Sequence, residues 1–339
     1  MGIKITYKKK TPLSNEPQTT LKSAGKEQGK TKQDDTANQG PVPFIDKISV
    51  VMDVPAEMRH DSFVSVMTQT KDYELFKSSK RQPPFNRAWR IVINCIPNAM
   101  KWPVLSASFD MSKQQALKFR VEFSPVDISN NGMEELHAAL MMLMHGGWNS
   151  FVEHGRVTMI EITVDLPGIG VDEFDVIPKQ AVYRQAWGKD GHLETIVLGK
   201  AAGNQTKIYN RGKKRSDKGQ KWQGPVTTRV ERRLRPQGLK LAKLLTLPNP
   251  FAGIILPASN LPAPPKEPKN KTYLWTMFQD SAKARGLTGA LNLLPEDKRT
   301  KYRAWLKLHP VSWWKPQVIW SHWPKYISDL QISDPYAWK

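Results

Sequence analysis

The chain reads LETIVLGKAAGNQTKIYNRGKKRSDKGQKWQGPVTTRVERRLR from Leu193 to Arg235. Three runs in it, 195–198, 207–210 and 227–234, are rich in β-branched and alternating residues and predict strands. Tyr209 closes the second run, and Glu231 lies in the third between arginines. A tyrosine among cations, with a carboxylate on the next strand, suits chemistry at a phosphodiester, because phenol, carboxylate and cation can each take a role there.

The segments before this stretch continue a β-rich pattern. Strands are predicted at 46–54, 88–96, 117–124 and 157–166, and a helix over 132–151 that is interrupted at Gly146-Gly147. Together these elements predict an α+β fold, a mainly antiparallel sheet with helices on one face. The pattern leaves open whether the sheet is one unit or two units that divide near Pro125.

Composition changes along the chain predict four regions. Residues 1–40 form a basic tail too poor in apolar residues to fold, either an aid to DNA binding or dispensable. Residues 41–260 form the α+β region; within it, 238–255 begins as a helix and breaks at its prolines. Residues 261–271 are a Pro-rich linker, and 272–339 form a helical region with seven of the 12 tryptophans. Those tryptophans could stack on bases, but packing in a small helical core is favoured.

The charge distribution indicates a polyanionic partner. The chain of 339 residues has a formal charge of +20, and the segment from Arg211 to Lys243 holds 12 Lys and Arg against two acids. Nucleic acid is favoured over a membrane, although a solvated loop is the alternative. A single cysteine excludes a disulfide framework and a zinc cluster, and no apolar run reaches membrane-spanning length. We therefore expect a cytoplasmic protein without a membrane span.

The predicted strand 157–166 offers a candidate metal site. Period-2 alternation places Glu161, Thr163 and Asp165 on one face. Two carboxylates on a half-buried strand are costly unless they are paired or bind a cation, and hard oxygen ligands select Mg²⁺ or Mn²⁺. The equally weighted alternative is that both carboxylates form ion pairs with the arginines of the 227–234 strand.

Two further glutamates lie on predicted strands beside arginine. Glu231 shares its strand face with Arg229 and Arg233, and it is a third candidate metal ligand because its strand directly follows the tyrosine strand. Glu122 lies beside Arg120 in LKFRVEFS, where a plain cross-strand ion pair is the favoured interpretation.

Tyr209 is the candidate nucleophile. A phenol with a pKa near 10 is a poor nucleophile at neutral pH, so it needs nearby cations or a polarised phosphate. Taken alone, a tyrosine at a strand end more often only packs. The residues predicted to contact DNA are the cations around it, Lys207, Arg211, Lys213, Lys214, Arg215, Arg229 and Arg233.

The order of three segments carries a resemblance. VTMIEITVDLPG, then ETIVLGKAAGNQTKIYNRGKK, then TTRVERRLR resembles the replication initiators of rolling-circle plasmids and related phages, chiefly the Rep_trans type and more distantly filamentous-phage gene II-type proteins. The match spans roughly residues 119–251. It places the acidic strand positions of the family on Glu161 and Asp165, the later acid on Glu231 and the tyrosine on Tyr209.

The chain also departs from the family pattern. Met159 stands where arginine is usual, the first acid is Glu161 rather than Asp, and Val197 and Lys200 stand where tyrosine and serine are common. The His-hydrophobe-His metal motif of other rolling-circle nickases is absent, which fits both the carboxylate-based subgroup and a protein that has lost activity.

The resemblance implies a metal-dependent nickase. Tyr209 would cut an origin strand with Mg²⁺ or Mn²⁺, giving a 5′-phosphotyrosine link and a free 3′-hydroxyl. The implied partners are double-stranded origin DNA, single-stranded DNA, a host helicase, a polymerase and a second copy of the chain. Two alternatives remain open: a non-enzymatic, sequence-specific DNA-binding replication regulator of the same fold, and a single-strand DNA-binding protein.

Overall fold

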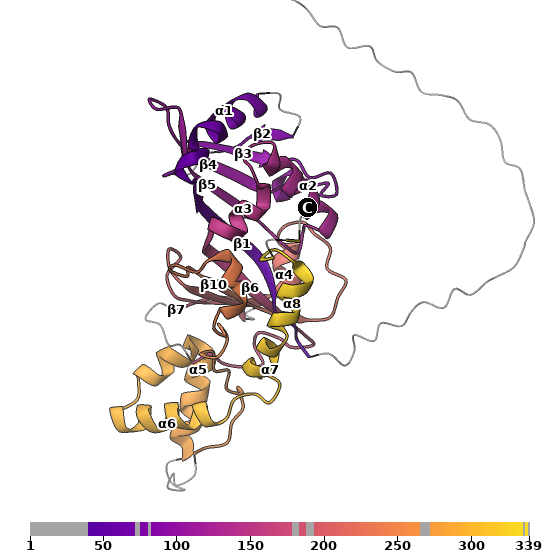
Figure 1. Ribbon diagram of the computed structural model, residues 1–339. Helices are drawn as coiled ribbons and strands as arrows, with labels where there is room; N and C mark the ends of the chain where they lie inside the picture. The colour runs from indigo at the N-terminus through magenta and orange to yellow at the C-terminus, as the bar shows by residue number, and fades with distance from the viewer. Residues whose placement is uncertain are drawn as a thin grey trace, which may run out of the picture. The chain divides into compact units, whose positions relative to one another are not determined.

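A computed structural model describes residues 40–71, 75–80, 83–177, 183–187, 193–264, 272–334 and 336–337 (Figure 1). The predicted N-terminal tail, except Gly40, lies outside the described residues, as does most of the predicted linker. Among the described helices, none combines the length and the apolar character that a bilayer crossing requires.

The described residues form a ten-stranded antiparallel sheet with helices, which confirms the predicted α+β class. The strand order across the sheet is β2-β3-β4-β5-β1-β6-β10-β9-β8-β7. The strands are β1 (Phe44–Asp53), β2 (Phe76–Ser78), β3 (Arg87–Ile91), β4 (Val104–Asp110), β5 (Gln115–Phe123), β6 (Arg156–Pro167), β7 (Tyr183–Trp187), β8 (Leu193–Leu198), β9 (Gln205–Asn210) and β10 (Thr227–Leu234). The helices are α1 (Arg59–Gln69), α2 (Asn130–Met141), α3 (Gly147–His154), α4 (Arg211–Ser216), α5 (Thr272–Asn292), α6 (Glu296–Leu308), α7 (Pro316–Ser321) and α8 (Trp323–Leu330).

The sheet consists of two repeats with the same topology. In the first repeat, β1 lies at the centre of the sheet and pairs with β5, and β4, β3 and β2 follow in that order toward the edge. Strands β6–β10 repeat this arrangement on the other side, and the two first strands, β1 and β6, pair antiparallel at the seam. The sheet is therefore duplicated, and the two repeats divide between Phe123, where β5 ends, and Arg156, where β6 begins, an interval that contains Pro125.

A shared tripeptide aligns the two repeats. Arg120-Val121-Glu122 in β5 and Arg229-Val230-Glu231 in β10 occupy the last strand of each repeat, and both valines are fully buried. Arg120 lies opposite Ser106 of β4, whereas Arg229 lies opposite Tyr209 of β9. By register, Ser106 therefore holds the position in the first repeat that Tyr209 holds in the second.

Alternation gives the sheet an apolar and a polar face. The apolar side chains of the central strands join α1, α2 and α3 in the main core, where Trp148 and Phe151 of α3 are fully buried. The helix predicted over 132–151 is two helices, because Gly146 and Gly147 adopt positive φ angles of 79° and 50°. The polar face carries the charged side chains of β5, β6, β9 and β10.

The C-terminal region divides into two parts. Helices α5 and α6 enclose a small core of their own around Trp275, Phe278 and Tyr302. Helices α7 and α8 instead return to the main core, where the Trp323 indole donates a hydrogen bond to the Leu244 carbonyl. Trp314 donates to the Ile254 carbonyl in the same way. The described tryptophans of this region thus pack as core residues, the favoured interpretation of the sequence.

Several elements differ from the sequence prediction. The apolar run after Gly238 forms two short 3-10 turns, 241–246, rather than an α-helix. The basic segment after Tyr209 opens with helix α4, whose first turn is capped by the Asn210 side chain accepting a hydrogen bond from the Lys213 amide. Strands β2, β4 and β7 were not anticipated, because short or mixed runs carry little periodic signal.

Candidate functional site

A basic cleft of about 430 Å³ opens beside Tyr209. It lies on the polar face of the sheet where β1, β6, β9 and β10 meet helix α4. Its charged lining residues are six cations, Lys101, Arg211, Lys214, Arg215, Lys218 and Arg229, and three carboxylates, Asp46, Asp127 and Asp165. The other lining residues are Phe44, Val126, Tyr209 and Gln220. The excess of cations suits a phosphate-bearing ligand.

The Tyr209 side chain is only 4% exposed and is held from two sides. Its hydroxyl donates a hydrogen bond to Glu231 Oε2 over 3.3 Å. The Lys214 ammonium lies 3.7 Å from the ring centroid, in cation–π contact. Burial raises the pKa of Tyr209 above its ordinary value, and the Glu231 carboxylate adds to the rise. The phenol therefore stays protonated at rest, with a carboxylate placed to take its proton.

Glu231 is the most connected acid of the site. Its Oε1 lies 2.8 Å from the Lys207 ammonium, and its Oε2 lies 4.0 Å from the Lys214 ammonium. Burial alone would raise the pKa of Glu231, but the hydrogen bond from Lys207 and the charges of Lys207 and Lys214 bring it below its ordinary value. Glu231 is therefore ionised at neutral pH and can accept a proton.

Three carboxylates converge behind the tyrosine. One oxygen each of Asp46, Glu161 and Glu231 lies within 4.8 Å of the others. Asp46 joins them through a β-bulge, because Ile45 pairs with Ile162 and Lys47 pairs with Glu161, which leaves Asp46 as the extra residue. Asp46 was not predicted as a member of this cluster, because strict period-2 alternation cannot place two successive residues on one face.

Asp165 lies apart from this cluster. Both of its oxygens accept hydrogen bonds from Arg229, over 2.7 and 2.9 Å, and Arg211 forms a further ion pair with it. Of the three predicted metal ligands, the structure thus brings Glu161 and Glu231 together with Asp46, and surrounds Asp165 with guanidinium groups. Glu161 itself is paired with Arg233.

The predicted DNA-contacting cations divide by position. Arg211, Lys214, Arg215 and Arg229 line the cleft. Lys207 and Arg233 instead hold the carboxylates of the cluster. Lys213 points toward acids outside the cleft, with ion pairs of 3.5 Å to Glu194 and 3.8 Å to Asp217. Lys218, which is not among the cations predicted to contact DNA, also lines the cleft.

An aromatic support fixes the basic helix. The Arg211 and Arg215 guanidinium groups lie 5.2 and 5.4 Å from the Trp222 ring. Gly212 allows this approach, because a Cβ there would come within 2.7 Å of the indole. Trp222 therefore packs helix α4 from outside and helps keep its cations at the cleft.

The donor set fits a divalent cation. Three carboxylate oxygens are the hard ligands that Mg²⁺ and Mn²⁺ prefer. Burial raises the pKa of Asp46, Arg229 opposes the rise and Glu231 adds to it. A raised pKa means that this environment destabilises the ionised form of the carboxylate, and a bound cation would stabilise that form.

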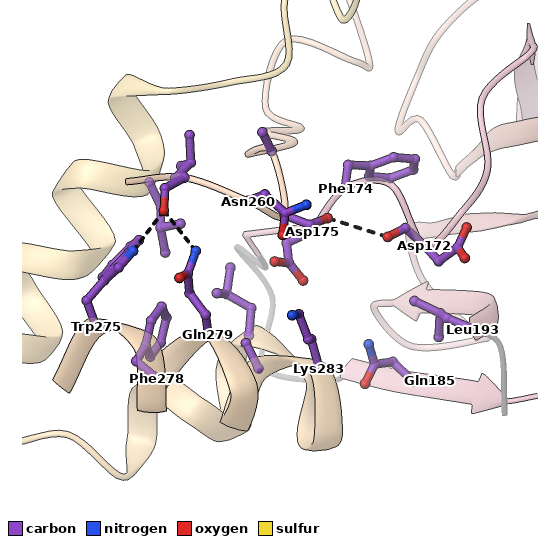
Figure 2. Close-up of a pocket in the computed structure, with 16 residues that line it drawn as sticks. Asp172, Phe174, Asp175, Gln185, Leu193, Asn260, Trp275, Phe278, Gln279 and Lys283 are labelled. Carbon is purple, nitrogen blue, oxygen red and sulfur yellow. Dashed lines mark hydrogen bonds between the residues drawn. The ribbon is translucent and has the colours of Figure 1, made fainter. Parts of the chain in front are cut away.

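A second cavity, of about 300 Å³, shares no lining residue with the Tyr209 cleft; its lining side chains are drawn in Figure 2. The indole of Trp275 and the amide of Gln279 both donate to the Leu261 carbonyl at its wall (Figure 2). Burial raises the pKa of Asp175, which also lines the cavity, to about 6. None of the predicted site residues lines this cavity, so it is separate from the Tyr209 cleft.

Comparison with known proteins adds no family: no protein-family model matches the chain, and no curated protein matches it.

Proposed function

We propose that this protein is a DNA-nicking initiator of the rolling-circle type, with Tyr209 as its nucleophile. One observation carries the proposal: the Tyr209 hydroxyl is hydrogen-bonded to an ionised, buried carboxylate at the edge of a cation-lined cleft. A tyrosine that merely packs does not require a base, a cation over its ring and a cation-lined cleft together. The motif resemblance supports the same reaction.

The side chains of the cleft suggest how the reaction proceeds. Cations of helix α4 and Arg229 hold the phosphates of a single strand. The Tyr209 oxygen bonds to the scissile phosphorus while its proton passes to Glu231 Oε2. The bond from phosphorus to the 3′-oxygen breaks, which leaves a 5′-phosphotyrosine and a 3′-hydroxyl.

Lys214 is the candidate proton donor to the leaving oxygen. Its ammonium lies between the Tyr209 ring and Glu231 and lines the cleft. Burial lowers the pKa of Lys214, so its proton is released more easily than that of an ordinary lysine. A divalent cation held by Asp46, Glu161 and Glu231 would polarise the phosphoryl oxygens and supply electrostatic stabilisation.

A specific observation favours a second candidate function. Glu161 and Glu231 already have cationic partners, Arg233 and Lys207, so the carboxylates are neutralised without a metal. A non-enzymatic DNA-binding regulator that keeps the same basic cleft would show this ion-pair network. The two candidates differ in whether a covalent protein–DNA bond forms.

A nicking assay separates them. Supercoiled plasmid carrying the replicon from which the gene comes is incubated with the protein and Mg²⁺ or Mn²⁺, and nicked circles with covalently bound protein are sought. We expect Tyr209→Phe to abolish both nicking and the adduct while DNA affinity stays near wild type. Tyr273→Phe is the matched control, because Tyr273 is 56% exposed and does not line the Tyr209 cleft.

The position of the adduct is decisive. Peptide mapping should place the phosphotyrosine on residue 209. An adduct that persists in Tyr209→Phe would move the nucleophile to Tyr183, the nearest other candidate in the matched segment. Absence of nicking and adduct in the wild type, with DNA binding intact, would support the regulator instead.

A further inference from the structure

The first repeat contains a second basic cleft, of about 380 Å³. It lies on the same polar face of the sheet, over β3, β4 and β5. Its charged lining residues are five cations and two carboxylates: Lys47, Lys80, Arg90, Lys101, Arg120, Glu122 and Asp127. The proposed nickase reaction assigns no role to this cleft.

The repeat symmetry shows how this cleft differs from the Tyr209 cleft. It keeps the Arg-Val-Glu strand, but Ser106 occupies the position equivalent to Tyr209. Val51 pairs with Arg120 in the first repeat as Asp165 pairs with Arg229 in the second, so Val51 occupies the position equivalent to Asp165. The first repeat thus keeps the strand arginine and a cation-lined cleft but lacks the phenol, which removes the nucleophile and leaves a surface suited to binding.

The two clefts adjoin. Lys101 and Asp127 line both of them and form an ion pair of 2.5 Å at the junction. From β9, which carries Tyr209, to β5, which carries Arg120, the sheet order passes through four strand spacings. At about 4.8 Å each this is roughly 19 Å. That distance matches about six stacked nucleotides at about 3.4 Å per phosphate of one strand.

We propose that the first-repeat cleft binds the sugar-phosphate backbone of the same single DNA strand whose scissile phosphate lies at Tyr209. The inference rests on the proposed function for the identity of the strand, and it adds a second, non-catalytic holding site about six nucleotides away. Its ligand is the phosphodiester backbone rather than particular bases, because the charged lining is mostly Lys and Arg. The strand would then span both repeats and cross the seam between β1 and β6.

Length-dependent binding tests this inference. Fluorescein-labelled oligothymidylates of 3 and 18 nucleotides are titrated with protein carrying Tyr209→Phe, so that no cleavage intervenes. In this background, Lys80→Gln and Arg90→Gln are combined. Arg90 donates hydrogen bonds to the carbonyls of Ala99 and Met100, so its replacement also removes structural contacts. Lys80 is exposed, and the single variant Lys80→Glu therefore changes the charge of the cleft without that loss.

The expected result is a loss confined to the long strand. Two neutralised cations on single-stranded DNA should reduce the salt slope by about 1.4, which is roughly a 25-fold loss of affinity at 0.1 M salt. The 3-mer should bind as tightly as before, because three nucleotides at about 3.4 Å each are too short to reach from the Tyr209 cleft to Arg120. The matched control Arg303→Gln with Lys307→Gln removes the same charge from exposed positions on α6 and should change neither affinity.

Three outcomes would overturn the inference. These are an unchanged affinity for the 18-mer in both the double variant and Lys80→Glu, an equal loss on both lengths, and an equal loss in the α6 control. The readout does not depend on nicking. A wild-type protein that fails to nick while its 18-mer binding still requires Lys80 and Arg90 would refute the nickase and leave the second strand-binding cleft in place.

Discussion

Three cations of one surface, Lys214, Arg215 and Lys218, should set the salt dependence of DNA binding. All three line the Tyr209 cleft, and they make up half of its cations. Each cation that neutralises a phosphate of single-stranded DNA contributes about 0.7 to the slope of log affinity against log salt concentration. Replacing all three by glutamine should therefore flatten the slope by about 2, which is roughly a 100-fold loss of affinity at 0.1 M salt.

The same basic segment provides its own control. Lys213, Lys221 and Lys243 are exposed and line neither basic cleft. A triple glutamine variant at these positions carries the same change in net charge. Because phosphate contacts act locally and exposed charges farther away are screened by salt, this control should lose less than one unit of slope.

The measurement is fluorescence anisotropy of a labelled 18-nucleotide strand between 50 and 400 mM salt, with the melting temperature of each variant checked first. Equal slopes in the cleft variant and the wild type would show that DNA binds elsewhere. Equal flattening in both triple variants would show that net charge, rather than the cleft, attracts the strand. Either result would refute the assignment of the cleft as the strand-binding surface.

Three further predictions concern the carboxylates. Nicking should vanish in chelator and return with Mg²⁺ or Mn²⁺, whereas full activity in chelator would contradict a metal role. Asp46→Asn should raise the metal concentration needed for the half-maximal nicking rate. Arg229→Met removes one of the two guanidinium partners of the half-buried Asp165 carboxylate and should lower the unfolding free energy in urea by about 2 kcal/mol, part of which Asp165→Asn in the same chain should recover. Asp175 has a pKa raised from 3.8 to about 6, so the folded state binds its proton more tightly and stability falls as pH rises between these values. Asp175→Asn should therefore stabilise the protein by about 3 kcal/mol at pH 7.5 and leave it nearly unchanged at pH 4, as measured by chemical denaturation.

The strands that carry the site could be predicted from the sequence because each is half buried. Strand β10 spans the predicted residues 227–234, and β6 extends the predicted 157–166 by one residue at each end. In such strands apolar residues must alternate with polar ones, so both the strand and the face of each side chain follow from the order of residues. Glu161, Asp165 and Glu231 lie on the face that alternation assigned to them.

The choice of partners on that face could not be predicted. Asp46 reaches the cluster only through a bulge, which alternation does not reveal. Asp165 meets two guanidinium groups because its strand neighbour Arg229 lies directly opposite and Arg211 follows at the start of α4. Sequence spacing gives the face of a strand residue, but strand order and register decide which charges on that face touch.

The sequence left the duplication of the sheet open. Apart from the Arg-Val-Glu tripeptide, the two repeats share little, since the positions of Tyr209 and Asp165 are Ser106 and Val51 in the first repeat. Burial needs only apolar residues of suitable size on one face, so two repeats can keep a common topology while their polar faces diverge. The strand order, rather than residue identity, preserves the relationship.

The seam between β1 and β6 makes the carboxylate cluster a reporter of correct assembly. One member, Asp46, belongs to the first repeat, and the other two, Glu161 and Glu231, belong to the second. If the chain were cut before Arg156, neither fragment would contain the complete set. Two separately produced fragments would therefore regenerate the cluster only when β1 and β6 pair in the native register. Recovery of the proposed nicking activity would then measure the fraction of fragment pairs that assemble in this register.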